Sequence, residues 1–226
     1  MLFMTVPTAG SHPELLSNLI RDCGLPPSQI VIIATRPNLS FPDGVIKVED
    51  FGSINIQRWW NLGISEAEKR GATTVAVLND DMWVAGETFT ELQEALSSTG
   101  AAIASPHREG ERIGLNQGRL VPYTPKIWGC LWMLNLASGL RPNEEYQWWF
   151  GDNDLDIRAR RDFGGVVTRK VRYEHLHPGV GTGMNPVLAE LATQDAVVYQ
   201  RDYARIQTLT RWWNTFARPF GKDVRG

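Results

Sequence analysis

Apolar residues in the first half of the chain form short runs that are separated by stretches of helical spacing. The runs are rich in β-branched residues, which predicts buried strands over residues 2–6, 30–34, 45–48 and 73–78. Between them, apolar positions recur every three or four residues, and the helices are expected to begin at a capping box on Ser11 and at Ser53. Gly24 and Gly71 are expected to end these helices. Strands that alternate with helices in this way predict an α/β fold with a mostly parallel central sheet.

The second half of the chain is less regular. A helix is predicted over residues 89–99, and Asp152 is expected to cap a second helix that ends at Phe163. Strands are predicted over 101–104 and 166–173, residues 127–134 are apolar, and residues 106–117 form a polar loop without a clear period. We find no repeat or linker. We therefore expect one main domain over residues 1–185, followed by a helical extension over residues 186–226.

Composition narrows the class of protein. The formal charge of the 226 residues is −2, which gives no general attraction to nucleic acid. The chain has no apolar stretch long enough to span a membrane and no signal-peptide pattern at its start, so we expect a cytoplasmic protein. Cys23 and Cys130 stand apart in apolar surroundings and are expected to be buried thiols. Nine Trp residues suit core packing or the flat faces of sugar rings and bases.

Two acidic clusters carry the most chemical information. Asn79-Asp80-Asp81 follows the predicted strand 73–78, and 152–156 contains three Asp at alternate positions. Ligands of parallel sheets bind at the carboxyl ends of strands, where 79–81, Pro7-Thr8 and Thr35-Arg36 are all expected to lie. Carboxylate oxygens at such a place are suitable ligands for Mg²⁺ or Mn²⁺. The plainer interpretations are a polar turn at 79–81 and helix capping by the acids of 152–156.

Several familiar motifs are excluded. The acids of 152–156 do not begin a calcium loop, because the positions that require Gly and Glu hold Ile157 and Phe163. His175 and His177 have no third soft ligand nearby, which argues against structural zinc. The glycines of 179–183 do not match a dinucleotide fingerprint, because the third required position is Met184. A loop that closes over phosphates is the functional interpretation of this segment, and an ordinary connector is the alternative.

Three of these segments together resemble the family 2 glycosyltransferases of the GT-A fold. The segment 79–81 resembles the metal motif of the family, and 152–158 resembles its Glu-Asp-x-Asp-x-x-x-Arg segment. His177 and the glycines after it resemble the third motif, and the likeness covers about residues 1–185. The family's acidic residue after the second strand is replaced here by Thr35-Arg36, and Gly151 stands where the family often has Glu.

The resemblance implies a role for each candidate residue. Asp81, with help from Asp80 and His177, would hold Mg²⁺ or Mn²⁺, and the catalytic base would be Asp152 or Asp154. The residues that would border a nucleoside-diphosphate sugar are Pro7, Thr8, Thr35, Arg36, Asn61, Asn79 and Asp80. The residues that would shape an acceptor site are Trp128, Trp132, Trp148 and Trp149.

The expected activity is inverting transfer of a hexose or pentose to an acceptor hydroxyl, on a glycan, protein, lipid or modified nucleic acid. The compact size resembles small bacterial or phage-encoded members, which implies the cytoplasm of a bacterium or of a phage-infected host. Two other classes stay open. A nucleotidyltransferase shares the α/β sheet and metal carboxylates but usually has a basic, glycine-rich loop early in the chain. A carbohydrate-binding module accounts for the Trp residues but has no need of two carboxylate clusters.

Overall fold

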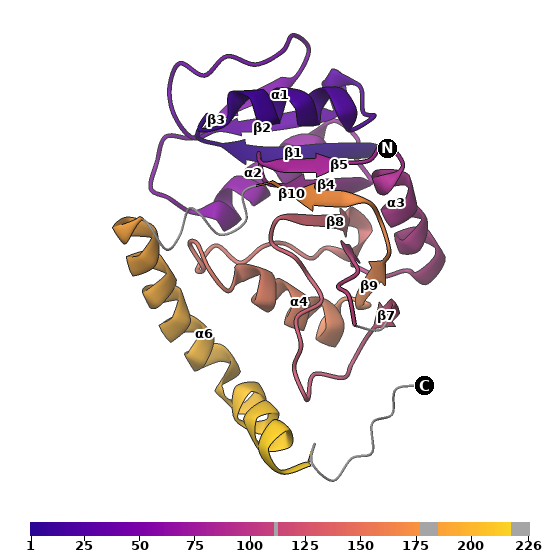
Figure 1. The fold of residues 1–226 in the computed structure, drawn as a ribbon, viewed down its shortest axis with the longest axis vertical. Helices are drawn as coiled ribbons and strands as arrows, with labels where there is room; N and C mark the ends of the chain where they lie inside the picture. Colours follow the sequence, from indigo (N-terminus) through magenta and orange to yellow (C-terminus); the bar gives the residue numbers. More distant parts are fainter. Residues whose placement is uncertain (111–112, 177–184, 218–226) are drawn as a thin grey trace.

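A computed structural model describes residues 1–110, 113–176 and 185–217 of the chain. The described residues form one large sheet, one two-stranded sheet and five α-helices (Figure 1). The large sheet contains β1 (Leu2–Thr8), β2 (Ile30–Ala34), β3 (Ile46–Glu49), β4 (Thr74–Leu78), β6 (Ile103–Pro106), β7 (Gly114–Asn116), β8 (Leu131–Asn135) and β9 (Val166–Arg169). The small sheet pairs β5 (Met82–Val84) with β10 (Tyr173–His175). The helices are α1 (Pro13–Asp22), α2 (Ile56–Lys69), α3 (Thr88–Thr99), α4 (Gly151–Asp162) and α6 (Pro186–Trp212).

The large sheet has the strand order β3-β2-β1-β4-β8-β6-β9-β7. Its first four strands are parallel, as the alternation of strands and helices predicted. β8 is inserted antiparallel between β4 and β6, whereas β9 pairs parallel with β6. The α/β fold with a mostly parallel sheet and a C-terminal helical extension is therefore confirmed.

Alternate residues of each strand face two helical layers. Ile30 and Ile32 of β2 join the core under α1 and α3, whereas Val31 and Ile33 join the core under α2 and α4. Both faces are covered at the centre of the sheet, so β2, β4 and β6 are buried at every residue rather than at alternate ones. Cys23 and Cys130 are buried, free thiols in the first core, as expected.

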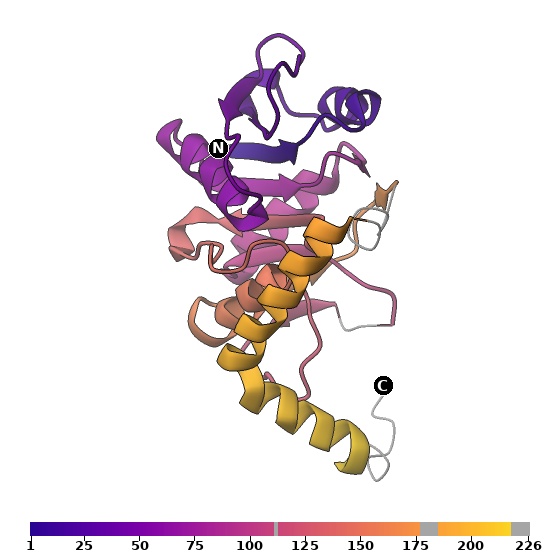
Figure 2. The same cartoon turned by 90° about the vertical axis from the view of Figure 1, so that its left-hand side faces the viewer.

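The extension α6 packs beside α4 through its first part and continues past the rest of the molecule (Figure 2). A third core cluster joins them, in which Tyr199 and Tyr203 of α6 contact Ile157 of α4 and Tyr146. The backbone of Tyr203 is non-helical, which kinks α6 within this contact. Among the described residues, we find no helix with the length and apolarity needed to cross a membrane.

Three expected helix starts are wrong by one or two residues. His12 rather than Ser11 is the first cap of α1, and its side chain makes no capping hydrogen bond. Asn55 replaces Ser53 at α2, because its side-chain oxygen accepts from the amide of Arg58 at 2.9 Å. α4 begins at Gly151, directly after Phe150, so Asp152 lies inside the first turn and is not the cap.

The strand boundaries differ most in the second half of the chain. The predicted strand 166–173 divides into β9 of the large sheet and β10 of the small sheet, and the predicted strand 101–104 becomes β6, shifted to 103–106. β5 and β7 were not predicted, because each has three residues and takes its conformation from a partner strand. The apolar stretch 127–134 contains the first part of β8.

The close packing of α2 on β1 depends on Gly63. A Cβ at this position would lie 1.8 Å from Oγ1 and 2.6 Å from Cβ of Thr5, a buried β1 residue. Because Thr5 is β-branched and held in the sheet, its side chain cannot move aside without displacing the helix. Gly63 therefore sets the spacing between α2 and the sheet.

We predict that Gly63→Ala lowers the free energy of unfolding by about 1–3 kcal/mol, the usual cost of overpacking a core. Urea unfolding followed by circular dichroism measures it. Gly86→Ala is the matched control, because a Cβ at Gly86 meets no atom within 4 Å. Equal stability of the two variants would show that α2 does not depend on this contact.

Candidate active site

The carboxyl ends of β1, β2 and β4 bring three predicted residues together. The hydroxyl of Thr8, the last residue of β1, donates to Oδ2 of Asp80 at 2.6 Å. Thr35, which follows β2, donates from its amide at 2.9 Å and from its hydroxyl at 3.0 Å to the Thr8 carbonyl. Burial raises the pKa of Asp80, and the hydrogen bond from Thr8 opposes this shift. Pro7 is buried within β1, whereas Arg36 is exposed beyond β2.

Asp81 lies where β4 leads into the small sheet. Its carbonyl accepts from the amide of Leu176 at 3.0 Å, which fixes the start of β5 beside the end of β10. Nε2 of His175 is 3.2 Å from Oδ1 of Asp81, but this buried oxygen receives no hydrogen bond of good geometry from the described residues. A buried carboxylate oxygen without a donor is a plausible ligand for a cation.

The acids at 80 and 81 fit Mg²⁺ or Mn²⁺ as partial ligands. Mg²⁺ is usually held by one or two carboxylates, with water and substrate phosphates completing its shell. No group of three or more metal-binding side chains occurs in the part of the chain that the structure describes. His177, the third expected ligand, and the glycine-rich loop 177–184 lie outside the described residues.

The second acidic cluster reaches the same region through the segment 128–131. The amide of Asn79 donates to the Cys130 carbonyl at 3.1 Å. A Cβ on Gly129 would lie 3.3 Å from Oδ2 of Asp152, so the backbone of this segment lies against that carboxylate. Burial raises the pKa of the Cys130 thiol to about 12, and the charges of Asp81 and Asp152 add to the shift. Cys130 therefore lies between the two acidic clusters.

Asp152 is the acid of α4 with the least internal pairing. Its Oδ1 accepts from the amide of Asn153 at 2.9 Å. Burial raises the pKa of Asp152, while the nearby guanidinium of Arg108 opposes the shift. Arg108 stacks on Trp128, with its guanidinium carbon 3.9 Å from the ring centroid. Arg108 was not predicted as a site residue, because it lies in a loop without periodicity.

The other two acids of the cluster are engaged inside the protein. Asp154 is 2% exposed and accepts from the Tyr203 hydroxyl at 2.6 Å and from Nε of Arg158 at 2.8 Å. Asp156 is fully buried and pairs with Arg160, as expected for acids four residues before an Arg. Both oxygens of Asp154 thus accept hydrogen bonds inside the protein. Asp152 is therefore the acid of this cluster that borders the segment 128–131.

The four candidate acceptor Trp residues differ in exposure. Trp132 is fully buried and packs edge-on against Trp60 at 5.5 Å, so its assignment to an acceptor surface was wrong. β8 places it in the core under α2. Trp128 is covered on one face by Arg108, and Trp148 is half-buried against the same core as Trp132. Trp149 is 50% exposed and is therefore the best placed of the four to contact a ligand.

Asn61 does not extend from a strand end. It lies on α2, and its amide nitrogen donates to the Pro142 carbonyl at 3.0 Å and to the Glu144 carboxylate at 2.7 Å. These contacts hold the loop before α4, so the expected role at a nucleotide is replaced by a structural one. Asn61 reaches both partners because α2 packs against that loop.

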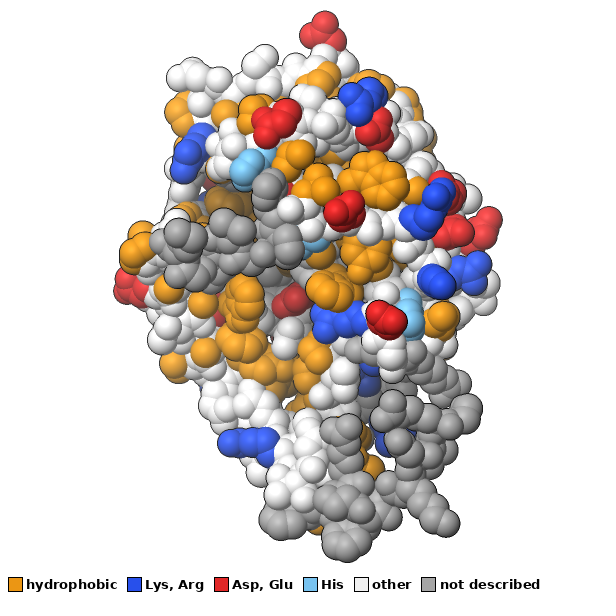
Figure 3. Space-filling model, in the orientation of Figure 1, with side chains coloured by type: hydrophobic (Ala, Val, Ile, Leu, Met, Phe, Trp, Pro, Cys, Tyr) orange, Lys and Arg blue, Asp and Glu red, His pale blue; other side chains and the backbone are white. Residues whose placement is uncertain are grey.

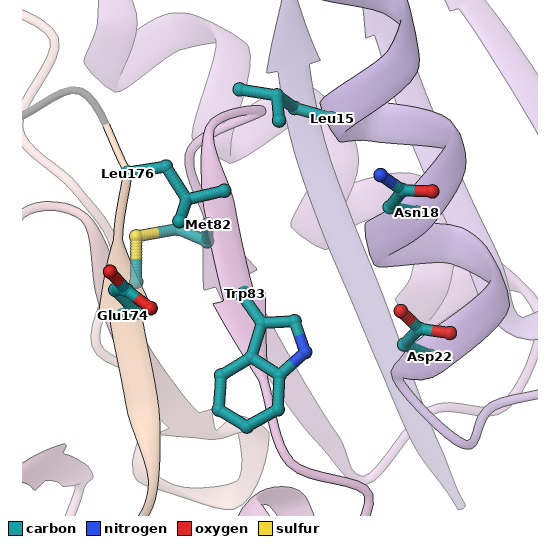
Figure 4. A pocket seen from close by; sticks show the side chains of 7 residues that line it. All are labelled: Leu15, Asn18, Asp22, Met82, Trp83, Glu174 and Leu176. Atoms are coloured by element: carbon teal, nitrogen blue, oxygen red, sulfur yellow. The ribbon is translucent and has the colours of Figure 1, made fainter.

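Hydrophobic side chains form a broad patch across the middle of one face of the molecule (Figure 3). A separate hollow of about 300 Å³ lies between α1 and the small sheet (Figure 4). Its lining residues are Leu15, Asn18, Asp22, Met82, Trp83, Glu174 and Leu176. Both charged groups in this lining are acidic, so the hollow is not suited to a diphosphate. The hollow adjoins the strand-end cluster, because Met82 follows Asp81 and the amide of Leu176 donates to the Asp81 carbonyl.

No protein-family model and no curated protein matches the sequence. Solved structures do match the fold. The mannosyltransferase PcManGT from Pyrobaculum calidifontis, in complex with GDP-Man and Mn²⁺, has a TM-score of 0.58 at 14% identity over 97% of this chain and 71% of its own. S. aureus TarS 1-349 has a TM-score of 0.57 at 12% identity, with 99% and 75% covered. Its complex with UDP has a TM-score of 0.56 at 14% identity, with 100% and 75% covered. At these identities the likeness establishes the fold alone.

We predict that Asp156→Ala lowers the free energy of unfolding by about 3–5 kcal/mol, because Arg160 keeps a buried charge without its carboxylate. Asp152→Asn is the contrasting variant. Since burial disfavours the ionised form of Asp152, a neutral amide there is expected to change stability by less than about 1 kcal/mol. Parallel urea titrations compare them. A large loss in Asp152→Asn would make Asp152 a structural acid.

Proposed function

We propose that the protein is a metal-dependent glycosyltransferase that moves a sugar from a nucleoside diphosphate to an acceptor hydroxyl with inversion. The observation that carries this proposal is that the segment 128–131 contacts both acidic clusters, since the Cys130 carbonyl accepts from the amide of Asn79 and Gly129 lies against the carboxylate of Asp152. A donor diphosphate and an acceptor hydroxyl must meet between a charge-neutralising group and a base. A fold shared with proteins whose structures hold UDP or GDP-Man supports the same conclusion.

The donor half of the site is assigned to the strand ends. Thr8, Thr35 and Asn79 would border the nucleoside, together with Arg36 at the rim. Asp80 and Asp81 would hold Mg²⁺ or Mn²⁺, which neutralises the charge that develops on the departing diphosphate. Arg108 adds a second positive charge near Asp152. Asp80 is held in place by Thr8, so the carboxylates are fixed before a ligand arrives.

The acceptor half is assigned to Asp152 and Trp149. Asp152 takes the proton of the acceptor hydroxyl as its oxygen attacks the anomeric carbon, and the proton remains on the carboxyl group until product leaves. Trp149 presents an exposed indole face to the acceptor sugar or aglycone. The alternative base, Asp154, is tied to Arg158 and Tyr203 and is assigned a structural role.

Nucleoside-diphosphate binding is expected to depend on a divalent cation through Asp81. We predict that UDP or GDP binds at least about tenfold more tightly with Mn²⁺ than with chelator, and that Asp81→Asn removes this difference. Titration calorimetry with both nucleotides measures it. His175→Gln is the matched control, because it alters a neighbour of Asp81 and leaves both carboxylates. Equal affinity of the wild type with and without metal contradicts the metal assignment.

Loss of the base is expected to affect the chemical step alone. We predict that Asp152→Asn lowers kcat by about 10²–10⁴-fold while nucleotide affinity is unchanged. Because the pKa of Asp152 is raised, kcat/KM of the wild type should fall with decreasing pH at a value above the ordinary Asp pKa of about 3.9. A panel of labelled nucleotide sugars and acceptors provides the assay. Transfer by Asp152→Asn at the wild-type rate would contradict the assignment.

The same panel separates the alternatives. A nucleotidyltransferase would release pyrophosphate from a nucleoside triphosphate and a sugar phosphate. A carbohydrate-binding protein would bind saccharides and turn over no donor. Retention of anomeric configuration in the product would contradict the inverting mechanism, but the protein would still be a glycosyltransferase.

A further inference from the structure

A buried carboxylate of the C-terminal helix holds the loop that leads into α4. Asp195 of α6 is 1% exposed. Its Oδ1 accepts from the amide of Gln147 at 2.9 Å, and its Oδ2 accepts from the amides of Trp148 and Trp149, both at 2.7 Å. Three consecutive backbone N–H groups therefore converge on one side chain from a helix about 46 residues away in the sequence.

The charge of Asp195 has no cationic partner among the described residues, so these amides are what stabilise it. Burying a carboxylate is unfavourable unless hydrogen bonds replace its hydration. An apolar side chain at this position would pack α6 without that cost. Charged acceptors form short and directional hydrogen bonds to amides. The main effect of the carboxylate is therefore to fix the backbone of residues 147–149, and not to improve the packing of α6.

The loop is also held from the opposite side and at its end. The amide of Ile56, at the start of α2, donates to the Gln147 carbonyl at 2.7 Å. Phe150 adopts the left-handed region with φ of 62°, and its ring stacks on Tyr199 of α6 at 4.8 Å. There is no room for a Cβ at Gly151, because it would lie 2.0 Å from the side-chain nitrogen Nε2 of Gln57. The chain thus enters the first turn of α4 along a single path.

We propose that Asp195 is a positioning residue that sets the place of Trp149 and, through Phe150 and Gly151, of Asp152. The proposal rests on the proposed function for the roles of Trp149 and Asp152. It makes α6 a structural part of the acceptor half of the site. The donor half at the strand ends is held by β1, β2 and β4 and does not depend on α6.

The test uses Asp195→Asn, which keeps the shape of the side chain and replaces one acceptor oxygen by a donor that faces the amides. Arg201→Gln is the matched control. It also removes a contact between α6 and the segment before α4, the ion pair with Glu145 at 2.6 Å, but both partners are about half exposed. Asp195→Asn is expected to lower kcat for transfer by about 100-fold, the effect of a displacement of about 1 Å. Its UDP or GDP affinity should stay within about twofold of wild type, and Arg201→Gln should change neither quantity beyond that range.

Amide hydrogen exchange provides a readout that does not depend on activity. Asp195→Asn should lose protection over residues 147–153 and keep it in β1 and β4, whereas Arg201→Gln should keep both. If Asp195→Asn does not fold, Tyr199→Leu replaces it as the test variant, because it removes the stacking on Phe150. Tyr199→Leu should likewise lose protection over residues 147–153 and keep it in β1 and β4. Unchanged exchange over 147–153, or a loss of nucleotide affinity equal to the loss of kcat, overturns the proposal. Absence of sugar transfer by the wild type contradicts the proposed function instead, and hydrogen exchange still decides whether Asp195 fixes the loop.

Discussion

The parallel pairing of β2, β1 and β4 is the constraint on which the candidate site depends. In this register Thr8 is paired with Ala34 of β2, and Thr5 is paired with Val77 of β4 on the other side of β1. Parallel strands that run side by side end at the same edge. The hydroxyl of Thr8 therefore donates to the carboxylate of Asp80, and the hydroxyl of Thr35 donates to the Thr8 carbonyl, although 72 residues separate Thr8 from Asp80.

The antiparallel strand β8 brings the second half of the chain to that edge. Leu78, the last residue of β4, pairs with Leu131, the first residue of β8. In an antiparallel pair the residues that precede one strand lie beside those that follow the other. Cys130 is consequently next to Asn79, and Gly129 is within reach of Asp152. One reversed strand in an otherwise parallel region thus joins two acidic clusters that a purely parallel sheet would separate.

The sequence predicted the parts of the fold that have a local cause. The strands 30–34 and 73–78 are continuous apolar runs and were placed correctly within a residue, and the helices followed their apolar spacing. It could not predict the division of 166–173 into two sheets, because the partners of β9 and β10 are distant strands. The site was predictable at strand ends, where Thr8, Thr35 and Asp80 follow apolar runs. Trp132, Asn61 and Asp195 were assigned wrongly or not at all, since only tertiary packing decides whether such a side chain faces a core, a loop or a ligand.

The carboxylate of Asp195 also bears on where this protein can be divided. Residue 185 is the boundary that the family resemblance implies between the main domain and a helical extension. The hydrogen bonds at Gln147, Trp148 and Trp149 cross that boundary, as do the Tyr203 bond to Asp154 and the stacking of Tyr199 on Phe150. Residues 146–158 and 195–203 are consequently a single structural unit. A chain cut at residue 185 would leave three backbone amides of this loop without their acceptor, so a replacement helix would need an acceptor of the same reach.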